Sequence, residues 1–468
     1  MSEEVPGTWR QLRQYWAVMT VLAGGVLVGA VSIYLAASLL PTAVRDIGGD
    51  QLYAWNMTVY LVGQVVAAML AANVLRRAGA QGAYVTGFGL FAAGSVICTV
   101  APTMPIMLIG RGLQGLGAGL LTGLGFALIQ ATLPAALWSR GSAVISAMFG
   151  LGNFVGPALG GTLAQAGAWR WAFGALTVLA ITLGALAARV LRTIQLPAGG
   201  AAPRIPRWAL VLVVAAVASL SVASLTDSAP LIVALVITAA IMAVGFVVVE
   251  GRSSTRVLPA STYRRGSAMR WIYLTIAVLA SSVAVETFLP LFGQQLGDLP
   301  PVAAGFYGAA LSLGWALTQV WSASAHGRRA NALMLGGPAV LVIGLAVLAV
   351  TIAADASIGL VVGWLVVLVL AGSGIGMAMP HLTVRAMSSA EDQAEAQQAA
   401  ASIATVLTMG TASGAAVAGL LVNLGQPNLE TSARYLLAGF ALIAVVGIAT
   451  AKRLTARRYE PVAVDSMA

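Results

Sequence analysis

Charged residues are scarce in this sequence. Only 9% of its 468 residues are charged, whereas 59% are hydrophobic. Ordinary globular domains carry about 25% charged residues, so the composition excludes a soluble protein of this size. The segments between the apolar runs are short, which leaves no room for an additional soluble domain.

Side chains that bind metals or act as nucleophiles are equally scarce. The chain has one cysteine, Cys98, and two histidines. These numbers exclude an intrachain disulfide and nearly exclude metal clusters and Cys–His nucleophile pairs. The sequence has no HExxH or GxSxG stretch and no phosphate-binding loop for ATP. We therefore expect neither an enzyme nor a protein that carries a metal or another cofactor.

Long apolar runs are abundant instead. A helix needs about 20 residues to cross roughly 30 Å of hydrocarbon, and fourteen runs reach this length. The sequence therefore predicts an all-α polytopic membrane protein, and the even number of spans puts both termini on the same side. The predicted spans are 16–40, 54–75, 82–101, 105–131, 141–165, 170–190, 208–226, 229–249, 271–296, 302–325, 331–353, 357–384, 396–424 and 433–451.

Basic residues are unevenly distributed between the two sides of this topology. Segments on the N-terminal side hold 21 of the 25, the opposite segments hold Arg45, Arg170 and Arg434, and Arg111 lies within a span. Cytoplasmic loops are rich in Lys and Arg, so we predict cytoplasmic termini in the cell membrane. The basic residues behind the net charge of +10 are spread over loop ends that face anionic lipid, so we expect no nucleic-acid partner. The 24 arginines against one lysine indicate a GC-rich bacterial genome.

Glycine spacing indicates an internal repeat. Two glycine sets recur, with Gly152, Gly156 and Gly161 followed 258 residues later by Gly410, Gly414 and Gly419, and Gly115 and Gly117 followed 259 residues later by Gly374 and Gly376. Parallel repeats mark transporters that rock around a midplane cavity. We expect an N-terminal six-helix bundle in residues 1–192, a linker with two extra transmembrane helices in 193–265, and a C-terminal six-helix bundle in 266–468.

Two helix motifs carry a family resemblance. Residues 111–119 read RGLQGLGAG, and residues 150–161 read GLGNFVGPALGG, followed by WRW at 169–171. They resemble the fourth-helix motif RxxQGxG and the fifth-helix motif GxxxGPxxGG of the major facilitator superfamily. Together with fourteen spans and a basic segment before the ninth, they are most similar to the fourteen-helix drug:proton antiporter branch. The resemblance implies a major-facilitator fold and outward transport.

The second motif supplies the candidate gating residues. Glycines four residues apart let two helix backbones approach closely, and a proline frees a backbone carbonyl and can bend a helix. We expect a tight but slippery helix contact at a gate, with ordinary small-residue packing as the alternative. The residues are Gly152, Gly156, Pro157, Gly160 and Gly161.

Two regions depart from the family pattern. The loop between the second and third spans usually reads GxLaDrxGrr, but residues 72–81 read ANVLRRAGAQ. Arg76 stands at the aspartate position, while Arg77 and Gly79 fit, so the charge-relay gate attributed to this loop cannot work in its usual form. The first helix of the branch often carries an aspartate before a proline. Here that position is Ser32, and the polar groups of the first span include Ser32 and Tyr34 but no carboxylate.

Two charged residues lie inside predicted spans at similar depths. Arg111 is roughly 9 Å into the fourth span and Glu286 roughly 12 Å from the outer end of the ninth. The corresponding helices of the family line its cavity, and the family's arginine is implicated in proton coupling, with a glutamine, here Gln114, as its neighbour. We expect a direct or water-bridged contact between Arg111 and Glu286. Three alternatives are that Arg111 snorkels outward, that the pair is static, and that a kinked span displaces Glu286.

An acid in this position can couple transport to protons. Burial favours the neutral form of a carboxyl group, and a nearby arginine favours the ionised form. We expect Glu286 to load and release a proton as the halves rock, or to hold a cationic or hydrogen-bonding substrate. His381, near the cytoplasmic end of the twelfth span, is a further candidate relay, although packing is the commoner role of a lone histidine.

The sequence therefore predicts a monomeric secondary active exporter. It would move lipophilic or cationic small molecules out of the cytoplasm by alternating access, coupled to protons, with the small-molecule substrate, protons and the lipid bilayer as its partners. A lipid or glycolipid flippase or an uncoupled facilitator of the same fold is the main alternative, favoured by the missing acid in the first span. A membrane-embedded enzyme and a transport-dead sensor are the others.

Overall fold

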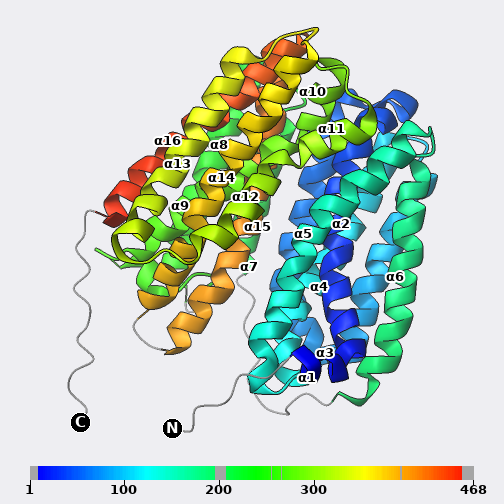
Figure 1. The fold of residues 1–468 in the computed structure, drawn as a ribbon, viewed down its shortest axis with the longest axis vertical. Coiled ribbons are helices and arrows are strands. Elements are labelled where there is room, and N and C mark those ends of the chain that lie inside the picture. Colours follow the sequence, from blue (N-terminus) through cyan, green and yellow to red (C-terminus); the bar gives the residue numbers. More distant parts are fainter. Residues whose placement is uncertain (1–8, 195–206, 254–255, 265, 391–392, 456–468) are drawn as a thin grey trace.

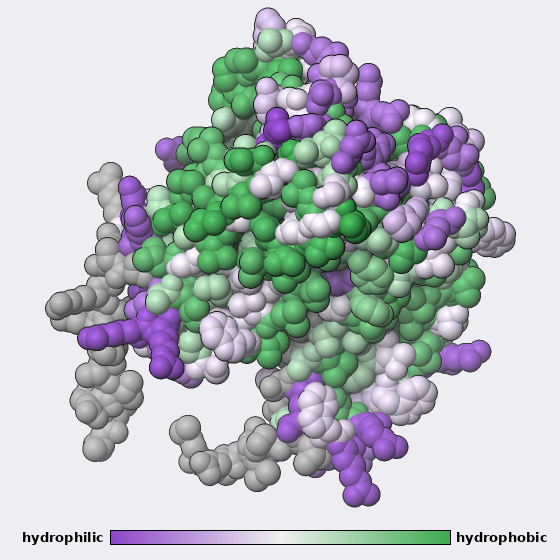
Figure 2. Space-filling model, turned by 45° about the horizontal axis from the view of Figure 1, so that its top comes forward, coloured by the Kyte–Doolittle hydropathy of each residue, from purple (hydrophilic) through white to green (hydrophobic). Residues whose placement is uncertain are grey.

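The computed structural model describes residues 9–194, 207–253, 256–264, 266–390 and 393–455, and within these ranges every regular element is a helix. Figure 1 shows the helices in two groups that meet at the upper end and separate towards the lower end. Hydrophobic side chains form a broad zone on the face in Figure 2, with hydrophilic side chains towards both ends of that face. This distribution is that of a protein whose middle zone faces lipid.

The N-terminal group contains five long helices that pack against one another. A short entry segment precedes them, made of α1 (Trp9–Leu12) and the 3₁₀ helix η1 (Arg13–Tyr15). The long helices are α2 (Trp16–Ile47), α3 (Tyr53–Val100), α4 (Met104–Thr132), α5 (Trp138–Gln165) and α6 (Arg170–Val190), with η2 (Asp50–Leu52), η3 (Ala135–Leu137) and η4 (Leu191–Thr193) between or after them. Helix α5 runs through Pro157 without interruption.

Helix α3 holds two predicted spans, which meet at Gly79. This glycine has φ of +69° and ψ of 177°, a non-helical conformation that turns the chain back through the bundle. A residue with a Cβ rarely adopts positive φ, whereas glycine adopts it readily. Gly79 of the degenerate loop motif therefore has a backbone role that does not depend on the missing charges.

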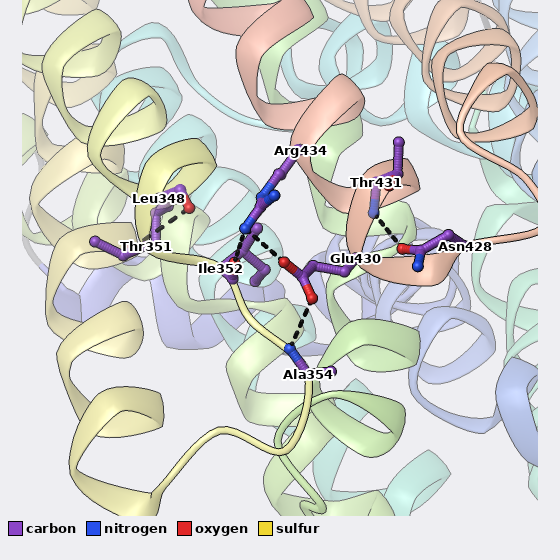
Figure 3. A network of polar contacts seen from close by, with 8 residues as sticks. All are labelled: Leu348, Thr351, Ile352, Ala354, Asn428, Glu430, Thr431 and Arg434. Carbon is purple, nitrogen blue, oxygen red and sulfur yellow. Dashed lines mark hydrogen bonds and ion pairs between the residues drawn. The ribbon is translucent and has the colours of Figure 1, made fainter.

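The C-terminal group contains the remaining helices. They are α9 (Met269–Ser282), α10 (Leu289–Gln295), α11 (Pro301–Gly308), α12 (Ala310–Ser322), α13 (Gly327–Thr351), α14 (Ile358–Ser388), α15 (Gln393–Leu424) and α16 (Leu429–Thr455), with η5 (Ala260–Tyr263) before α9 and η6 (Val283–Thr287) after it. A polar network ties the α13–α14 connection to α16 (Figure 3). Glu430 accepts from Ala354 N at 3.2 Å and pairs with Arg434, which donates to Ile352 O at 3.3 Å.

Two predicted spans of this group are interrupted rather than continuous. The ninth is divided into α9, η6 and α10, and the tenth into α11 and α12. Pro290, in the first turn of α10, has no N–H to donate, and its ring is incompatible with a helical carbonyl four residues earlier, at Glu286. The break therefore falls at the residue that carries the buried acid.

Helices α7 (Arg207–Ala223) and α8 (Ala229–Arg252) form a pair beside the two groups. Only 6% of the residues in the most apolar stretch of α8 are buried by the rest of the protein, so this helix faces lipid along most of its length. Helix α7 contacts both α3 and α15. Trp55 Nε1 donates to Ser221 O at 3.0 Å, and Asn423 Nδ2 donates to Thr226 O at 3.2 Å, just beyond the end of α7.

The predicted all-α polytopic architecture is confirmed. Eleven helical segments in the described ranges are long and apolar enough to cross a membrane. One of these segments, α3, contains two of the predicted spans. The remaining two predicted spans are α7, which is shorter, and the α11–α12 pair, which is interrupted. The domain boundaries stay a prediction, since residues 195–206 and 265 lie outside the described ranges.

Glycine contacts follow the internal repeat, but they change one predicted pairing. A Cβ on Gly152 or Gly156 would collide with α2, and one on Gly410 or Gly414 would be pressed against α9. Three glycines of α4 have counterparts with equivalent contacts in α14. Gly115 packs against Tyr60 as Gly372 packs against Leu311, and Gly117 packs against Gly87 as Gly374 packs against Gly337. Gly119 packs against Gln64 as Gly376 packs against Trp315. The expected pairing of Gly115 with Gly374 is therefore wrong by two residues, because glycines recur every second residue in both helices and spacing alone does not fix the register.

The α2–α5 contact gives a first testable prediction. A Cβ on Gly156 would lie 2.6 Å from Tyr34 Cβ and 2.9 Å from Leu35 N, so we expect Gly156→Ala to destabilise the protein by about 1–3 kcal/mol. Gly150→Ala is the matched control on the same helix, because nothing lies within 4 Å of its added Cβ. The measurement is the apparent melting temperature of each purified variant in detergent. Equal melting temperatures for the two variants would contradict the tight contact.

Candidate functional site

Glu286 lies in the break of the ninth span and is only 5% exposed. Its Oε1 accepts a hydrogen bond from Ser312 N at 2.7 Å, and its Oε2 accepts one from Ser312 Oγ at 2.9 Å. Ser312 is the third residue of α12, and the first N–H groups of a helix have no partner within it. The break in one span therefore presents a carboxylate, and the break in the next presents the positive end of a helix that is complementary to it.

Tyr34 extends this contact to the other group of helices. Its hydroxyl lies 3.1 Å from Ser312 Oγ. While Glu286 is ionised, the Ser312 hydroxyl donates to it, and the Tyr34 hydroxyl is then the donor in this second hydrogen bond. Tyr34 belongs to α2, so the chain Tyr34–Ser312–Glu286 joins the N-terminal group to both broken spans of the C-terminal group. Asn153 of α5 also lies beside the Tyr34 hydroxyl.

Arg111 forms a separate buried cluster within the N-terminal group. Its side chain is 0% exposed. Nη1 donates to Ser32 Oγ at 2.8 Å and to Gln114 Oε1 at 2.7 Å, and the guanidinium lies 4.2 Å from the centre of the Tyr60 ring. Gln114 Nε2 in turn donates to Ser95 Oγ at 2.7 Å. Gln114 is thus the neighbour of Arg111 that the family resemblance implies.

Arg111 and Glu286 make no direct contact, and Arg111 does not snorkel to the surface. No carboxylate of the described ranges lies within ion-pair distance of Arg111. The reason is the position of α2 between the two clusters. Successive residues of a helix are rotated by about 100°, so Ser32 and Tyr34 point to different sides of α2, one towards Arg111 and the other towards Ser312.

The Arg111 cluster contains two buried donors without an acceptor. Arg111 Nη2 and Asn56 Nδ2 make no hydrogen bond to any residue that the structure describes. Asn56 O accepts from Arg111 Nε at 3.4 Å, so the two residues are neighbours. An isolated buried guanidinium is costly, and here it is balanced by neutral acceptors and an aromatic face instead of by an acid.

Two of the five candidate gating residues, Pro157 and Gly161, lie where the two groups of helices meet, and the other three pack within the N-terminal group. Gly152, Gly156 and Gly160 face α2, whereas a Cβ on Gly161 would lie 2.6 Å from Val302 Cα of α11. Pro157 borders Gly305 of α11. These contacts lie towards the upper end in Figure 1, where α10 and α11 approach α2 and α5. Arg45 adds a hydrogen bond to Gln294 Oε1 at 3.1 Å on the same side.

The other candidates lie apart from Glu286. His381 Nε2 is 3.1 Å from Ser322 Oγ, and Ser322 is about 15 Å from Ser312 along α12 by helical rise. Arg76 donates to Asn73 Oδ1 at 2.8 Å beside the turn at Gly79, and Arg77 is exposed. Neither His381 nor the loop motif shares a hydrogen bond with the Glu286 cluster among the contacts of the described chain.

Sequence reasoning missed several members of both clusters. Ser312 is central to the Glu286 cluster but stands in an apolar stretch with no distinguishing motif. Only the break between α11 and α12 leaves its N–H without a partner in its own helix. Tyr60, Asn56 and Ser95 complete the second. The spacing of four residues between Asn56 and Tyr60 would have indicated a buried face, but Ser95 lies beyond the break at Gly79, and no spacing indicates that an arginine lies against them.

Comparisons with known proteins agree with this architecture. Residues 22–404 match the Major Facilitator Superfamily model. The chain is 44% identical over 458 residues to a "Probable multidrug-efflux transporter" of Mycobacterium tuberculosis, covering 96% of this chain and 97% of that protein. It is 26% identical over 381 residues to an "Uncharacterized MFS-type transporter" of the same organism, covering 80% of this chain and 55% of the relative.

Solved structures show the same fold. A crystal structure of a peptide transporter, POT, aligns with a TM-score of 0.68 and 17% identity over 94% of this chain and 95% of that one. A POT family transporter in complex with a thioalcohol-conjugated peptide aligns with a TM-score of 0.65 and 17% identity over 94% and 96% of the two chains. At this identity the likeness concerns the fold alone. With the family match and the relative of 44% identity, the conclusion is that the chain is a multi-pass membrane protein that belongs to the major facilitator superfamily.

Proposed function

We propose that this protein is a secondary active exporter that moves lipophilic or cationic small molecules out of the cytoplasm by alternating access coupled to protons. The observation that carries the proposal is the hydrogen-bonded chain Tyr34–Ser312–Glu286, which crosses between the two helix groups at a buried acid. The relative of 44% identity, a "Probable multidrug-efflux transporter", supports export and the class of cargo.

Proton coupling follows from what protonation does to this chain of hydrogen bonds. An ionised Glu286 only accepts, but a protonated one has an O–H to donate. When the acid donates to Ser312 Oγ, the Ser312 hydroxyl is free to donate to Tyr34, so both hydrogen bonds reverse their direction. Protonation of Glu286 therefore makes the Tyr34 hydroxyl an acceptor and leaves the proton of that hydroxyl without Ser312 as a partner, which changes the link between the helix groups.

Exchange of the cargo for protons follows if a proton and the cargo compete for the Glu286 carboxylate. Glu286 is the only acid in the middle of a predicted span, and an ionised carboxylate in a low-dielectric site attracts a cation strongly. Release of the cargo on one side then accompanies protonation of Glu286, and loading on the other accompanies its deprotonation. Arg111, on the far side of α2, holds Ser32 and thereby the orientation of the helix that carries Tyr34.

We further propose that the protein works as a monomer in the cell membrane, with a defined orientation. Both termini lie on the cytoplasmic side of the cell membrane, because 21 of the 25 basic residues fall in segments on that side. Of these, Arg204, Arg265, Arg457 and Arg458 lie outside the described ranges. The transporting unit is one chain with a six-helix bundle in residues 1–192, the extra helix pair in 193–265 and the second bundle in 266–468.

A lipid or glycolipid flippase or an uncoupled facilitator is the second candidate. The first span has no carboxylate, and the one acid of α2, Asp46, lies beyond that span at the end of the helix and is paired with Arg170. A transporter with a single acid in the middle of a predicted span has fewer groups with which to couple cargo to protons. The two candidates differ in whether a pH gradient drives transport.

Glu286→Gln tests the coupling. The amide can accept and donate hydrogen bonds but cannot take up a proton, so the fold should persist while the gradient-driven part of transport falls by at least about fivefold, the lower end of usual coupling energies. The measurement is efflux of a lipophilic cationic dye from proteoliposomes with and without an imposed pH gradient.

Asp50→Asn is the control for this variant, because it removes an exposed acid of η2. Gradient-driven efflux that is unchanged in Glu286→Gln would refute the coupling role. Wild-type transport that is fast but indifferent to the gradient would favour the uncoupled alternative.

Tyr34→Phe tests the link between the helix groups. It removes one neutral hydrogen bond, worth about 0.5–1.5 kcal/mol, so we expect gradient-driven efflux to fall about two- to tenfold while the melting temperature changes little. Tyr84→Phe is the matched control, because the buried Tyr84 hydroxyl has no hydrogen-bond partner to lose in the described chain. Equal efflux in both variants would show that the Tyr34 hydroxyl does not contribute.

A further inference from the structure

A recess of about 870 Å³ lies on the side of the N-terminal group, away from Glu286. Helices α2, α5 and α6 form its walls, and the entry segment α1–η1 lies at one end of it. The side chains on the walls are mainly apolar, and they include Ala23, Leu27, Val144, Met148, Leu179 and Leu183. The volume is in the range of pockets that hold a small organic molecule or part of a lipid.

Aromatic and basic residues surround the mouth of the recess. Trp9 and Trp16 are 59% and 64% exposed, and Arg10 and Arg13 of the entry segment also line the recess and are exposed. Trp and Arg together are typical of the zone where a protein meets lipid headgroups.

Arg140, at the start of α5, adds a third positive charge. Its guanidinium lies 5.6 Å from the centre of the Trp9 ring, and its Nε is buried without a hydrogen-bond partner in the described chain. No acid within the described ranges pairs with Arg10, Arg13 or Arg140. Two arginines that line the recess, together with Arg140 beside Trp9, therefore place three positive charges near its mouth, and no acidic side chain of those ranges neutralises them.

We propose that this recess binds an anionic phospholipid. The acyl chains lie between α2, α5 and α6, and the phosphate lies against Arg10, Arg13 and Arg140. Charge complementarity selects this occupant, because the three arginines repel the cationic molecules proposed as cargo and attract an anionic headgroup, each basic residue contributing roughly a fivefold gain in binding near such a lipid. Binding does not depend on the proposed export or on proton coupling. If the termini are cytoplasmic, as proposed above, the lipid belongs to the cytoplasmic leaflet, and only this point rests on the proposed orientation.

The electrostatic test compares two lipids on purified full-length protein in detergent. Phosphatidylglycerol and phosphatidylcholine with identical acyl chains are titrated, and the bound lipids are counted by native mass spectrometry. We expect the wild type to retain phosphatidylglycerol in preference to phosphatidylcholine, and the triple variant Arg10→Gln, Arg13→Gln, Arg140→Gln to bind phosphatidylglycerol at least about tenfold more weakly.

The matched control is the triple variant Arg252→Gln, Arg328→Gln, Arg329→Gln. It removes the same charge from exposed arginines that do not line the recess. An equal loss of phosphatidylglycerol in both triple variants, or equal retention of the two lipids by the wild type, would overturn the proposal.

A steric test locates the acyl chains. Thr20 lines the recess and is exposed, so Thr20→Trp should fill it and reduce retention of phosphatidylglycerol. Thr182→Trp adds the same bulk to an exposed position of α6 outside the recess and should leave retention unchanged. Full retention by Thr20→Trp, or displacement of phosphatidylglycerol by a lipophilic cationic dye, would also overturn the proposal.

Discussion

The contact between the Glu286 carboxylate and the first turn of α12 is the interaction on which the rest of the site depends. Non-helical backbone at membrane depth is tolerated only where protein or water satisfies its polar groups. Here one break supplies the acceptor and the next supplies the donors. The breaks also fit sterically, since a Cβ on Gly308 would lie 2.6 Å from Pro290 Cγ. Each interruption thus satisfies polar groups of the other, and together they create a polar site between the apolar surfaces of the two helix groups.

Helix α2 connects the Glu286 cluster to the Arg111 cluster. Ser32 holds Arg111 on one side of the helix, and Tyr34 meets Ser312 on another. The glycine face of α5 lies against the same stretch, because the position of Gly156 abuts Tyr34 and Leu35. A shift of α2 relative to α5 therefore changes the geometry of both clusters at once. Small residues at this contact reduce the steric resistance to such a shift.

The sequence predicted the features that depend on composition and local pattern. Hydropathy was sufficient for the fourteen spans, and the isolation of Glu286 among apolar residues was sufficient to select it. Pro290 could also have indicated the break, because its ring acts on the carbonyl of Glu286. The partners of the charged residues were not predictable, since they depend on which side of α2 faces which neighbour. Depth alone suggested that Arg111 and Glu286 would meet, but depth does not define the angle around a helix. Glycine periodicity left the register of α4 and α14 ambiguous for a similar reason.

The position of α7 makes the two lateral edges between the helix groups unequal. At one edge α3 meets α15, and α7 lies against both, with Trp55 and Asn423 holding its end. At the other edge α5 meets α11, and neither α7 nor α8 packs extensively against them in the part of the chain that the structure describes. A molecule that passes sideways between the hydrocarbon and the interior therefore meets a third helix on one edge only. The insert thus makes a pseudosymmetric scaffold asymmetric towards the bilayer, with one flank covered more than the other.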